Sequence, residues 1–185
     1  MKFVELPDDI AHVLQKIPRE KRGDFLLGHG FSLKKDDQKI NKVTEQKNGI
    51  CKEVYIFSDG ASRGNPGEAG AGYLITDSDG NILYEGRKYL GIATNNIAEW
   101  TALFLALETA HKMNMQEVKC FLDSELVVKQ MNGAYKVKNP DLRILFEKTK
   151  ILQTHFQKIS FAHIPREQNS HADRLSNEAI EQNKF

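Results

Sequence analysis

Four acidic side chains stand out because each falls at the edge of a predicted strand or helix. Asp59 and Asp123 close two stretches typical of strands, and Glu99 and Asp173 fall near the starts of two predicted helices. An ionised carboxylate at the tip of a buried strand is costly to desolvate unless another charge neutralises it. If the four meet, they need a counter-charge, and hard cations such as Mg²⁺ prefer oxygen ligands.

Such a group of acids could support the hydrolysis of a phosphodiester. Two divalent cations about 4 Å apart can activate a water molecule and stabilise the leaving oxygen. The sequence has no cluster of His and Cys that would favour zinc instead. Each acid also has a simpler interpretation, because Asp and Glu favour helix starts, turns and surfaces. Only the surrounding sequence can decide between these interpretations.

The elements that must position the acids alternate along the chain. Residues 77–80, D-S-D-G, predict the turn of a hairpin, and the segments after the hairpin alternate between helical and strand patterns. This order predicts an α/β fold with a mixed sheet flanked by helices, in which strand ends and helix starts converge at one edge. Strands are expected at 52–58, 69–77, 82–90, 118–122 and 158–164, and helices at 96–113, 124–133, 140–156 and 169–182.

The length of 185 residues suits one domain with a small appendage. Residues 1–36 predict a small, mostly helical segment, residues 37–50 a polar linker, and residues 51–185 the main domain. The composition is typical of a soluble protein, and the absence of a signal peptide or a long apolar run predicts a cytoplasmic location. A net charge of +1 does not by itself indicate a nucleic-acid binder.

The two cysteines, Cys51 and Cys120, lie far apart and form no C-x-x-C motif. This spacing favours reduced thiols in a cytosolic protein, with a disulfide or a metal site as the alternative. Trp100, the single tryptophan, follows Glu99 in a helical pattern, and we expect it to pack in the core beneath the acids.

Four sequence blocks resemble those of the type 1 ribonucleases H, in the same order and at suitable spacing over roughly residues 52–182. The resemblance implies an endonuclease that cleaves the RNA strand of an RNA–DNA hybrid and leaves 5′-phosphate and 3′-hydroxyl ends. It also implies a ribonuclease H-like fold, with a five-stranded mixed sheet in the order 3-2-1-4-5, and a four-acid site for two Mg²⁺ ions, with Mn²⁺ as an alternative. The blocks are D-G-A-S-R-G-N-P-G (59–67), T-N-N-I-A-E (94–99), F-L-D-S-E-L-V-V (121–128) and H-I-P-R-E-Q-N-S-H-A-D-R-L-S-N (163–177).

Carried over to this sequence, the resemblance makes Asp59, Glu99, Asp123 and Asp173 the metal-binding acids. His163 falls where the family keeps a mobile-loop histidine that helps the product leave or moves a proton. The alternative for His163 is a strand-end histidine with no chemistry.

Further residues could contact the hybrid. Some match family positions that do so, and others lie next to the predicted site. The only chemical handle that separates ribose from deoxyribose is the 2′-hydroxyl, which neutral amides and backbone groups can read. Glu125 departs from the amide that many relatives carry at its position. Simpler alternatives are an ordinary turn at 65–67, a helix N-cap at Asn169, and a solvated lysine face. The candidates are Gly64, Asn65, Thr94, Asn95, Asn96, Ser124, Glu125, Arg166, Asn169, Lys136 and Lys138.

The chain resembles the branch of the family without a basic handle, because only G-A-Y-K-V-K-N-P (133–140) stands where some relatives insert one. Residues 1–50 lack the Gly- and aromatic-rich pattern of the hybrid-binding module that some relatives carry. Their role stays open between packing, an extra substrate contact and partner binding. The expected partner is an RNA–DNA hybrid, with no membrane, and a monomer is expected.

Two rival functions fit parts of the same sequence. A 3′–5′ exonuclease of the same fold also uses four acids, but it lacks the G-N-P-G and T-N-N blocks found here. A non-catalytic hybrid-binding module should have lost at least one acid, and all four are present.

Overall fold

The computed structural model describes residues 53–182 of the chain. The predictions for residues 1–36, for the linker 37–50 and for Cys51 lie outside the described residues, so the domain boundary at residue 51 stays a prediction. Within the described part, no helix combines the length and the apolar character needed to cross a membrane.

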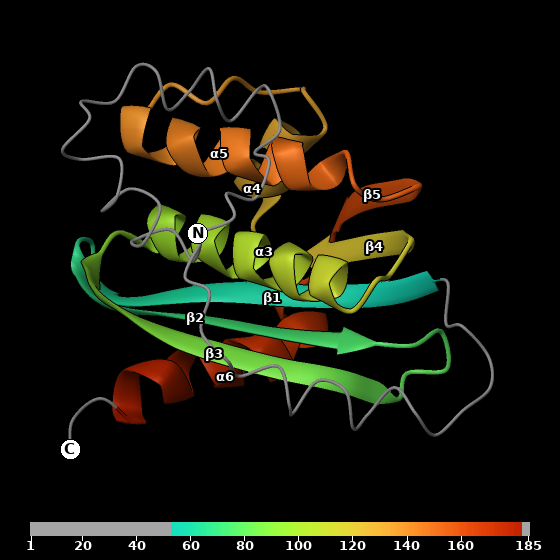
Figure 1. Cartoon of the computed structure of the whole chain (residues 1–185). Coiled ribbons are helices and arrows are strands. Elements are labelled where there is room, and N and C mark those ends of the chain that lie inside the picture. The colour runs from blue at the N-terminus through green and yellow to red at the C-terminus, as the bar shows by residue number, and fades with distance from the viewer. Residues whose placement is uncertain (1–52, 183–185) are drawn as a thin grey trace, which may run out of the picture. The chain divides into compact units, whose positions relative to one another are not determined.

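The sheet has five strands in the order β3-β2-β1-β4-β5 (Figure 1). The pairs β1–β2 and β2–β3 are antiparallel, whereas β1–β4 and β4–β5 are parallel. The predicted fold class and strand order are therefore confirmed. The strands are β1 (Glu53–Gly64), β2 (Gly67–Thr76), β3 (Ile82–Ala93), β4 (Glu117–Leu122) and β5 (Lys158–His163).

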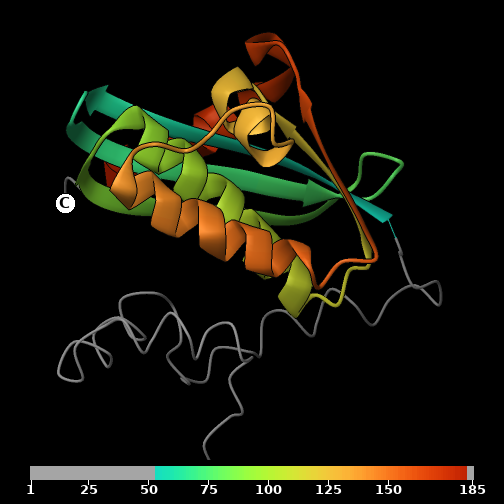
Figure 2. The ribbon, with the colours of Figure 1, turned by 90° about the horizontal axis from the view of Figure 1, so that it is seen from above.

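Helices cover the sheet on both faces (Figures 1 and 2). Helix α3 packs against β1 and β2 with α5 beside it, and α6 packs against β2, β1 and β3 from the other face. A short 3₁₀ turn, η3, leads directly into α6. The helices are α3 (Asn95–Lys112), α4 (Glu125–Met131), α5 (Pro140–Gln153) and α6 (Ser170–Glu181), and η3 is Arg166–Asn169.

Trp100 confirms the prediction of a core tryptophan. Its side chain is fully buried, and its ring lies edge-on to Phe146 of α5 at 5.8 Å between centroids. The indole Nε1–H donates to Oε1 of Gln130 in α4 at 3.2 Å, so the one polar atom of the ring is satisfied. Trp100 thereby ties α3, α4 and α5 together under the start of α3.

Strands β1 and β2 extend further toward each other than the sequence predicts. The predicted strands at 52–58 and 69–77 leave out residues 60–67, which contain three glycines and a proline, because Gly and Pro usually mark turns. Instead β1 runs on to Gly64, β2 already begins at Gly67, and only Asn65 and Pro66 lie between them. The extra residues pair with β2, from Asp59 opposite Gly72 to Gly64 opposite Gly67.

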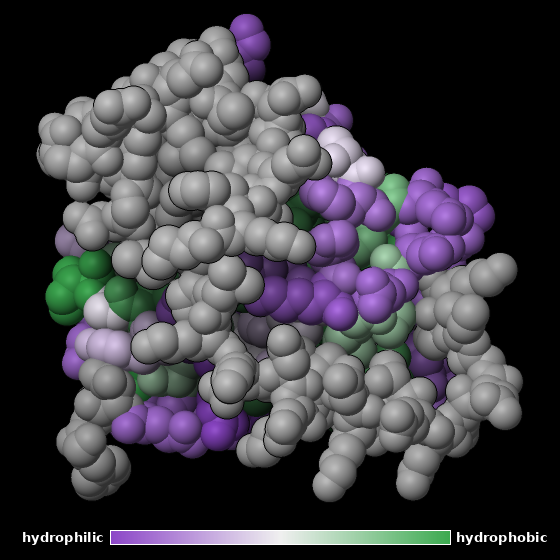
Figure 3. Space-filling view, in the orientation of Figure 1, coloured by the Kyte–Doolittle hydropathy of each residue, from purple (hydrophilic) through white to green (hydrophobic). Residues whose placement is uncertain are grey.

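At their other end, the strands carry partly exposed ion pairs. Lys119 of β4 pairs with Glu53 of β1 at 3.0 Å, and Lys158 of β5 pairs with Glu117 of β4 at 3.1 Å. The two lysine side chains are 44 % and 75 % exposed. In the space-filling view, the described surface toward β4 and β5 is largely hydrophilic (Figure 3).

Candidate active site

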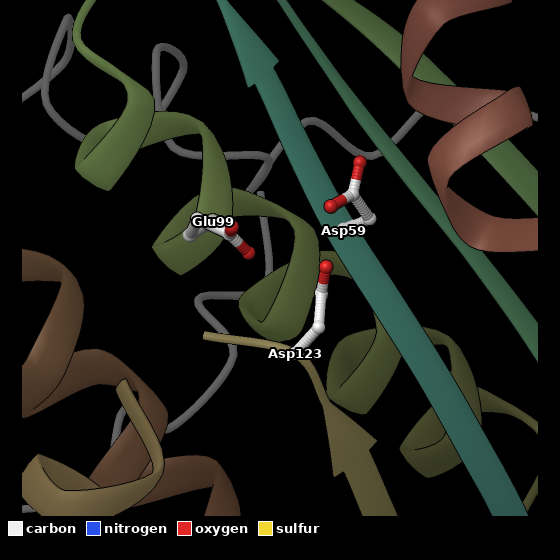
Figure 4. Close-up of side chains that lie close together, drawn as sticks. All are labelled: Asp59, Glu99 and Asp123. Atoms are coloured by element: carbon white, nitrogen blue, oxygen red, sulfur yellow. The ribbon is translucent and has the colours of Figure 1, made fainter. Parts of the chain in front are cut away.

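Three of the four predicted acids meet in one place. Asp59, Glu99 and Asp123 each offer a carboxylate oxygen, and these atoms lie within 4.8 Å of one another (Figure 4). Asp59 and Glu99 are buried, with 4 % and 6 % of their surface exposed, and Asp123 is half-buried. We name this group the acid cluster.

The pairing of β1 with β4 explains why two of these acids are neighbours. The parallel ladder ends at the pair Ser58–Leu122, so Asp59 and Asp123 are the next residue on each strand. Asp123 follows the end of β4, as predicted. The expectation that Asp59 closes its strand is wrong, because β1 continues beside β2 for five more residues. Asp59 marks the point where β1 loses its β4 neighbour.

Glu99 reaches the cluster because α3 lies directly on β1. A Cβ atom at Gly60 would stand 2.1 Å from the backbone nitrogen of Glu99, a separation that no side chain permits. Glu99 was expected in the first turn of its helix, but α3 begins at Asn95, so Glu99 lies in the second turn. Because the helix starts four residues before Glu99, this residue lies over Gly60 of β1 rather than at the tip of the helix.

Burial and mutual repulsion disfavour the ionised forms of the acids in the cluster. Burial raises the pKa of Asp59 to about 6, and the charges of Asp123 and Asp173 add to this effect. Burial, followed by the charges of Asp59 and Asp123, also holds the pKa of Glu99 well above its usual range. Oε2 of Glu99 is buried and has no hydrogen-bond partner among the described residues.

A divalent cation fits this donor set. All the candidate ligand atoms are carboxylate oxygens, which hard cations such as Mg²⁺ prefer, and no His or Cys belongs to the group. The unpartnered oxygen of Glu99 would gain a partner, and the cation would offset the repulsion that disfavours ionised acids here.

Asp173 stands apart from the acid cluster. It lies in the first turn of α6, as predicted, but its Oδ1 accepts from the Arg166 guanidinium at 2.5 Å. Asp173 is close enough for its charge to affect the pKa of Asp59, yet the group of mutually close oxygens does not include it. The structure therefore brings together three of the four predicted acids, and it pairs Arg166, a predicted substrate contact, with the fourth.

Two buried polar side chains bond to the cluster from the other side. The Nδ2 amide of Asn169 donates to Oδ1 of Asp123 at 2.7 Å and to the backbone oxygen of Ser58 at 2.9 Å. Asn169 occupies the N-cap position of α6, but its side chain makes no capping bond. The hydroxyl of Ser176, which the sequence analysis did not single out, donates to Oδ2 of Asp59 at 2.5 Å.

His163 is the last residue of β5 and pairs in register with Leu122. The predicted strand at 158–164 already included this residue, and its role as the family's mobile-loop histidine stays a prediction. The side chain of His163 is exposed. It is close enough to Glu125 for its charge to lower the pKa of that carboxyl, although the hydrogen bond from Lys129 lowers this pKa more.

Several predicted substrate contacts line the start of α3. Asn65 forms the hairpin turn, and its Oδ1 accepts from the backbone N–H of Asn95 at 3.2 Å. Thr94 caps α3 by accepting from the N–H of Ile97. Asn96 is exposed beside Asn95. Gly64, which ends β1 with φ 120°, precedes the Asn65 turn, whereas Ser124 lies elsewhere, as the N-cap of α4.

The basic residues lie on α4 and on the loop that follows it. Lys136 and Lys138 are exposed in the short connection to α5. Lys129 is already engaged, since it pairs with Glu125 at 2.9 Å and lies over the ring of Tyr135. A solvated face therefore accounts for Lys129, while the two loop lysines stay candidates.

Comparisons with known proteins agree with this geometry. Residues 57–179 match the protein family described as reverse transcriptase-like. The chain is 42 % identical over 130 residues to the bifunctional protein Rv2228c of Mycobacterium tuberculosis, covering 70 % of this chain and 36 % of that protein. It is 44 % identical over 128 residues to ribonuclease HI of Halobacterium salinarum, covering 69 % and 64 %.

A solved structure gives the same result in three dimensions. The crystal structure of LC11-RNase H1 in complex with an RNA/DNA hybrid aligns with a TM-score of 0.68 and 44 % sequence identity. The alignment covers 71 % of this chain and 99 % of that one. The chain thus spans nearly all of this structure, but only about a third of the length of the mycobacterial relative.

Proposed function

Because this chain belongs to the type 1 ribonuclease H family, we propose that it is an endonuclease that hydrolyses the RNA strand of RNA–DNA hybrids. The relative LC11-RNase H1 was crystallised with such a hybrid, which supports the choice of substrate. The products would carry 5′-phosphate and 3′-hydroxyl ends. The proposal includes a monomeric protein acting in the cytoplasm.

The observation that carries the proposal is the acid cluster. Asp59, Glu99 and Asp123 present carboxylate oxygens within 4.8 Å of one another, although two of the three are buried. We propose that these residues hold Mg²⁺, or Mn²⁺ in its place, with Asp173 as a more peripheral ligand. Two bound cations would supply the Lewis acidity that activates the attacking water and stabilises the departing 3′-oxygen of the RNA.

The residues around the cluster would bind and orient the hybrid. Asn95 and Asn96, at the exposed start of α3, can present amides to a ribose 2′-hydroxyl. Asn65 supports this edge through its bond to the backbone of Asn95. Lys136 and Lys138 would neutralise phosphates of the DNA strand, which predicts binding that weakens with salt.

Two residues beside the cluster would act after the substrate is bound. His163, exposed at the end of β5, would move a proton or help the product leave. Arg166 would contact a phosphate only when its ion pair with Asp173 opens, since the guanidinium is occupied in this structure.

A cleavage assay with three matched duplexes tests the proposal. An end-labelled RNA–DNA hybrid, the same sequence as double-stranded RNA, and the same sequence as DNA are each incubated with the full chain and Mg²⁺. We expect cleavage at internal positions of the RNA strand of the hybrid, and none after EDTA is added. A ladder that grows only from the 3′ end would indicate an exonuclease, and binding without cleavage would indicate a hybrid-binding module.

A further inference from the structure

Ser176 is a buried hydroxyl that the proposed reaction does not yet use. It lies in α6, its side chain is fully buried, and its Oγ–H donates to Oδ2 of Asp59 at 2.5 Å. The residues are 117 positions apart in the chain, so this bond joins α6 to β1 rather than neighbours in sequence.

The packing of α6 on the sheet brings the hydroxyl to this place. Asp59 stands opposite Gly72 of β2, so both residues face the same side of the sheet. A Cβ atom at Gly72 would stand 2.2 Å from the backbone nitrogen of Ser176, and one at Gly70 would stand 2.3 Å from its backbone oxygen. The two glycines therefore let the backbone of α6 rest on β2, which sets Ser176 beside Asp59.

The hydroxyl has one proton and two acceptors in reach. Besides Asp59, the backbone oxygen of Asp173 lies 2.8 Å from Oγ of Ser176. An ionised carboxylate is the stronger acceptor, because charge-assisted hydrogen bonds are about twice as strong as neutral ones. The bond to Asp59 also opposes the effect of burial on the pKa of that carboxyl, and so favours its ionised form.

The bond leaves the second oxygen of Asp59 available. Figure 4 shows one oxygen of Asp59 directed toward Glu99 and Asp123, and the other directed away from them. With Oδ2 held by Ser176, Oδ1 is the oxygen that can face a cation shared with the other two acids.

We propose that Ser176 is a positioning residue, which fixes the carboxylate of Asp59 so that Oδ1 is presented to the divalent cation. This role rests on the proposed function, since it concerns the same metal site. Ser176 touches neither substrate nor cation, and it acts only through Asp59. Without its hydroxyl, the carboxylate loses the side-chain donor that α6 supplies and can rotate away from the cluster.

The experiment compares three variants of the full chain with the wild type. Ser176→Ala removes the hydroxyl, and Ser176→Cys fills the space with a thiol, which is a weak donor. Thr149→Val is the matched control, because it removes another fully buried hydroxyl, whose recorded bond goes to Leu145 O within α5. Mn²⁺ affinity is measured on the protein alone by electron paramagnetic resonance, and kcat and KM are measured on the hybrid.

We expect Ser176→Ala and Ser176→Cys to bind Mn²⁺ about tenfold more weakly and to lower kcat about tenfold, with KM within about twofold, as for the loss of one hydrogen bond to a charged group. Thr149→Val should match the wild type in Mn²⁺ affinity and in kcat. All three variants should lose some thermal stability, because each lacks a buried hydroxyl. Thermal unfolding monitored by circular dichroism reports whether each variant is folded.

The inference and the proposed function fail in different ways. If the wild type cleaves the hybrid and Ser176→Ala matches it in Mn²⁺ affinity and kcat, Ser176 has no positioning role and the proposed function stands. If Ser176→Cys behaves as the wild type, side-chain volume matters rather than the donor, and the inference is again overturned. If the wild type does not cleave the hybrid, the proposed function fails, and the Mn²⁺ titrations alone decide the role of Ser176.

Discussion

The two ends of strands β1 and β4 treat charge in opposite ways. At one end, Lys119 pairs with Glu53 across the strands, and both side chains reach solvent. At the other end, Asp59 is buried beside Asp123 and Glu99, and no lysine belongs to the group. The same two strands therefore carry a neutral, partly exposed pair at one end and a buried excess of negative charge at the other.

The difference separates charges that serve the fold from charges kept for a ligand. An exposed ion pair contributes about 0–1 kcal/mol and can be removed at little cost. Buried acids that repel one another destabilise the folded state. Strongly shifted pKa values of this kind are concentrated at functional sites. A substitution at the buried end should therefore change activity most. It should also raise the stability of the metal-free protein, whereas most substitutions of buried residues lower stability.

Removing a carboxylate from the acid cluster should give the largest effect. We expect Asp59→Asn and Asp123→Asn to lower the rate of hybrid cleavage on the order of a thousandfold or more, because an amide cannot replace an anionic ligand worth several kcal/mol in the transition state. Glu117→Gln, at the exposed end, is the control and should retain the wild-type rate within about twofold. Single-turnover cleavage assays check both, and a fully active Asp59→Asn would exclude the metal site.

The histidine beside the cluster should give a smaller loss. We expect His163→Ala to slow cleavage on the order of 10- to 100-fold, at or below the lower range of general acid–base catalysis, because a proton carrier or a release step is lost. Mn²⁺ affinity should stay unchanged, since His163 is not one of the clustered ligands. His155→Ala, an exposed histidine after α5, provides the control. A loss of metal binding in His163→Ala would contradict this separation of roles.

The metal-free protein should gain stability when the cluster loses a charge. The pKa of Asp59 rises from 3.8 to about 6 on folding, so the folded state keeps its proton more readily than the unfolded chain. The stability associated with this group is therefore present at low pH and is lost as the pH rises from about 4 through 6. At 1.36 kcal/mol per pH unit, Asp59→Asn should recover up to about 3 kcal/mol at pH 7.

Urea denaturation in EDTA at pH 5 and pH 7.5 measures this gain. The variant should exceed the wild type in unfolding free energy at the higher pH, and the difference should shrink at the lower pH. Adding Mg²⁺ at pH 7.5 should stabilise the wild type and not Asp59→Asn, since only the wild type has the full set of ligands. A wild type that is more stable than the variant without metal would contradict the picture of a strained cluster.

The exposed end should show the smallest effect. We expect Lys158→Gln to change the free energy of unfolding by less than about 0.5 kcal/mol, because the lysine is 75 % exposed and its pairing with Glu117 is screened by solvent. The same denaturation experiment checks this. A loss of 2 kcal/mol or more would show that the two ends differ less than the burial of their charges indicates.

Much of the fold could be read from periodicity. The alternation of strand and helix patterns gave the elements, and the Gly- and Asn-containing blocks carried the resemblance that gave the strand order. The predicted strands at 52–58 and 69–77 fall short of β1 and β2, because the glycines between them were interpreted as turn signals. At Gly60 and Gly72 glycine serves instead to let helices α3 and α6 approach the sheet, which only the packed structure reveals.

The site was predictable where it depended on sequence type and not where it depended on contact. Asp59, Glu99 and Asp123 could be named from their surroundings, and the structure brings them together. The pairing of Asp173 with Arg166 depends on how η3 meets α6, and no local pattern encodes it. Ser176 follows Asp173 by three residues, so the two share a helix face, and this spacing is a sequence signal that could have identified Ser176.

Strand β4 ends directly before Asp123, and this limits where the chain can gain or lose residues. Strand residues advance by about 3.3 Å and alternate between faces, so one residue inserted into β4 would shift Asp123 along the sheet and point it to the opposite side. The turn at Asp77–Asn81, by contrast, lies beyond the distant ends of β2 and β3, where an insertion displaces no acid. Insertions and deletions among natural variants of this domain should therefore collect in that turn and be absent from the six residues of β4.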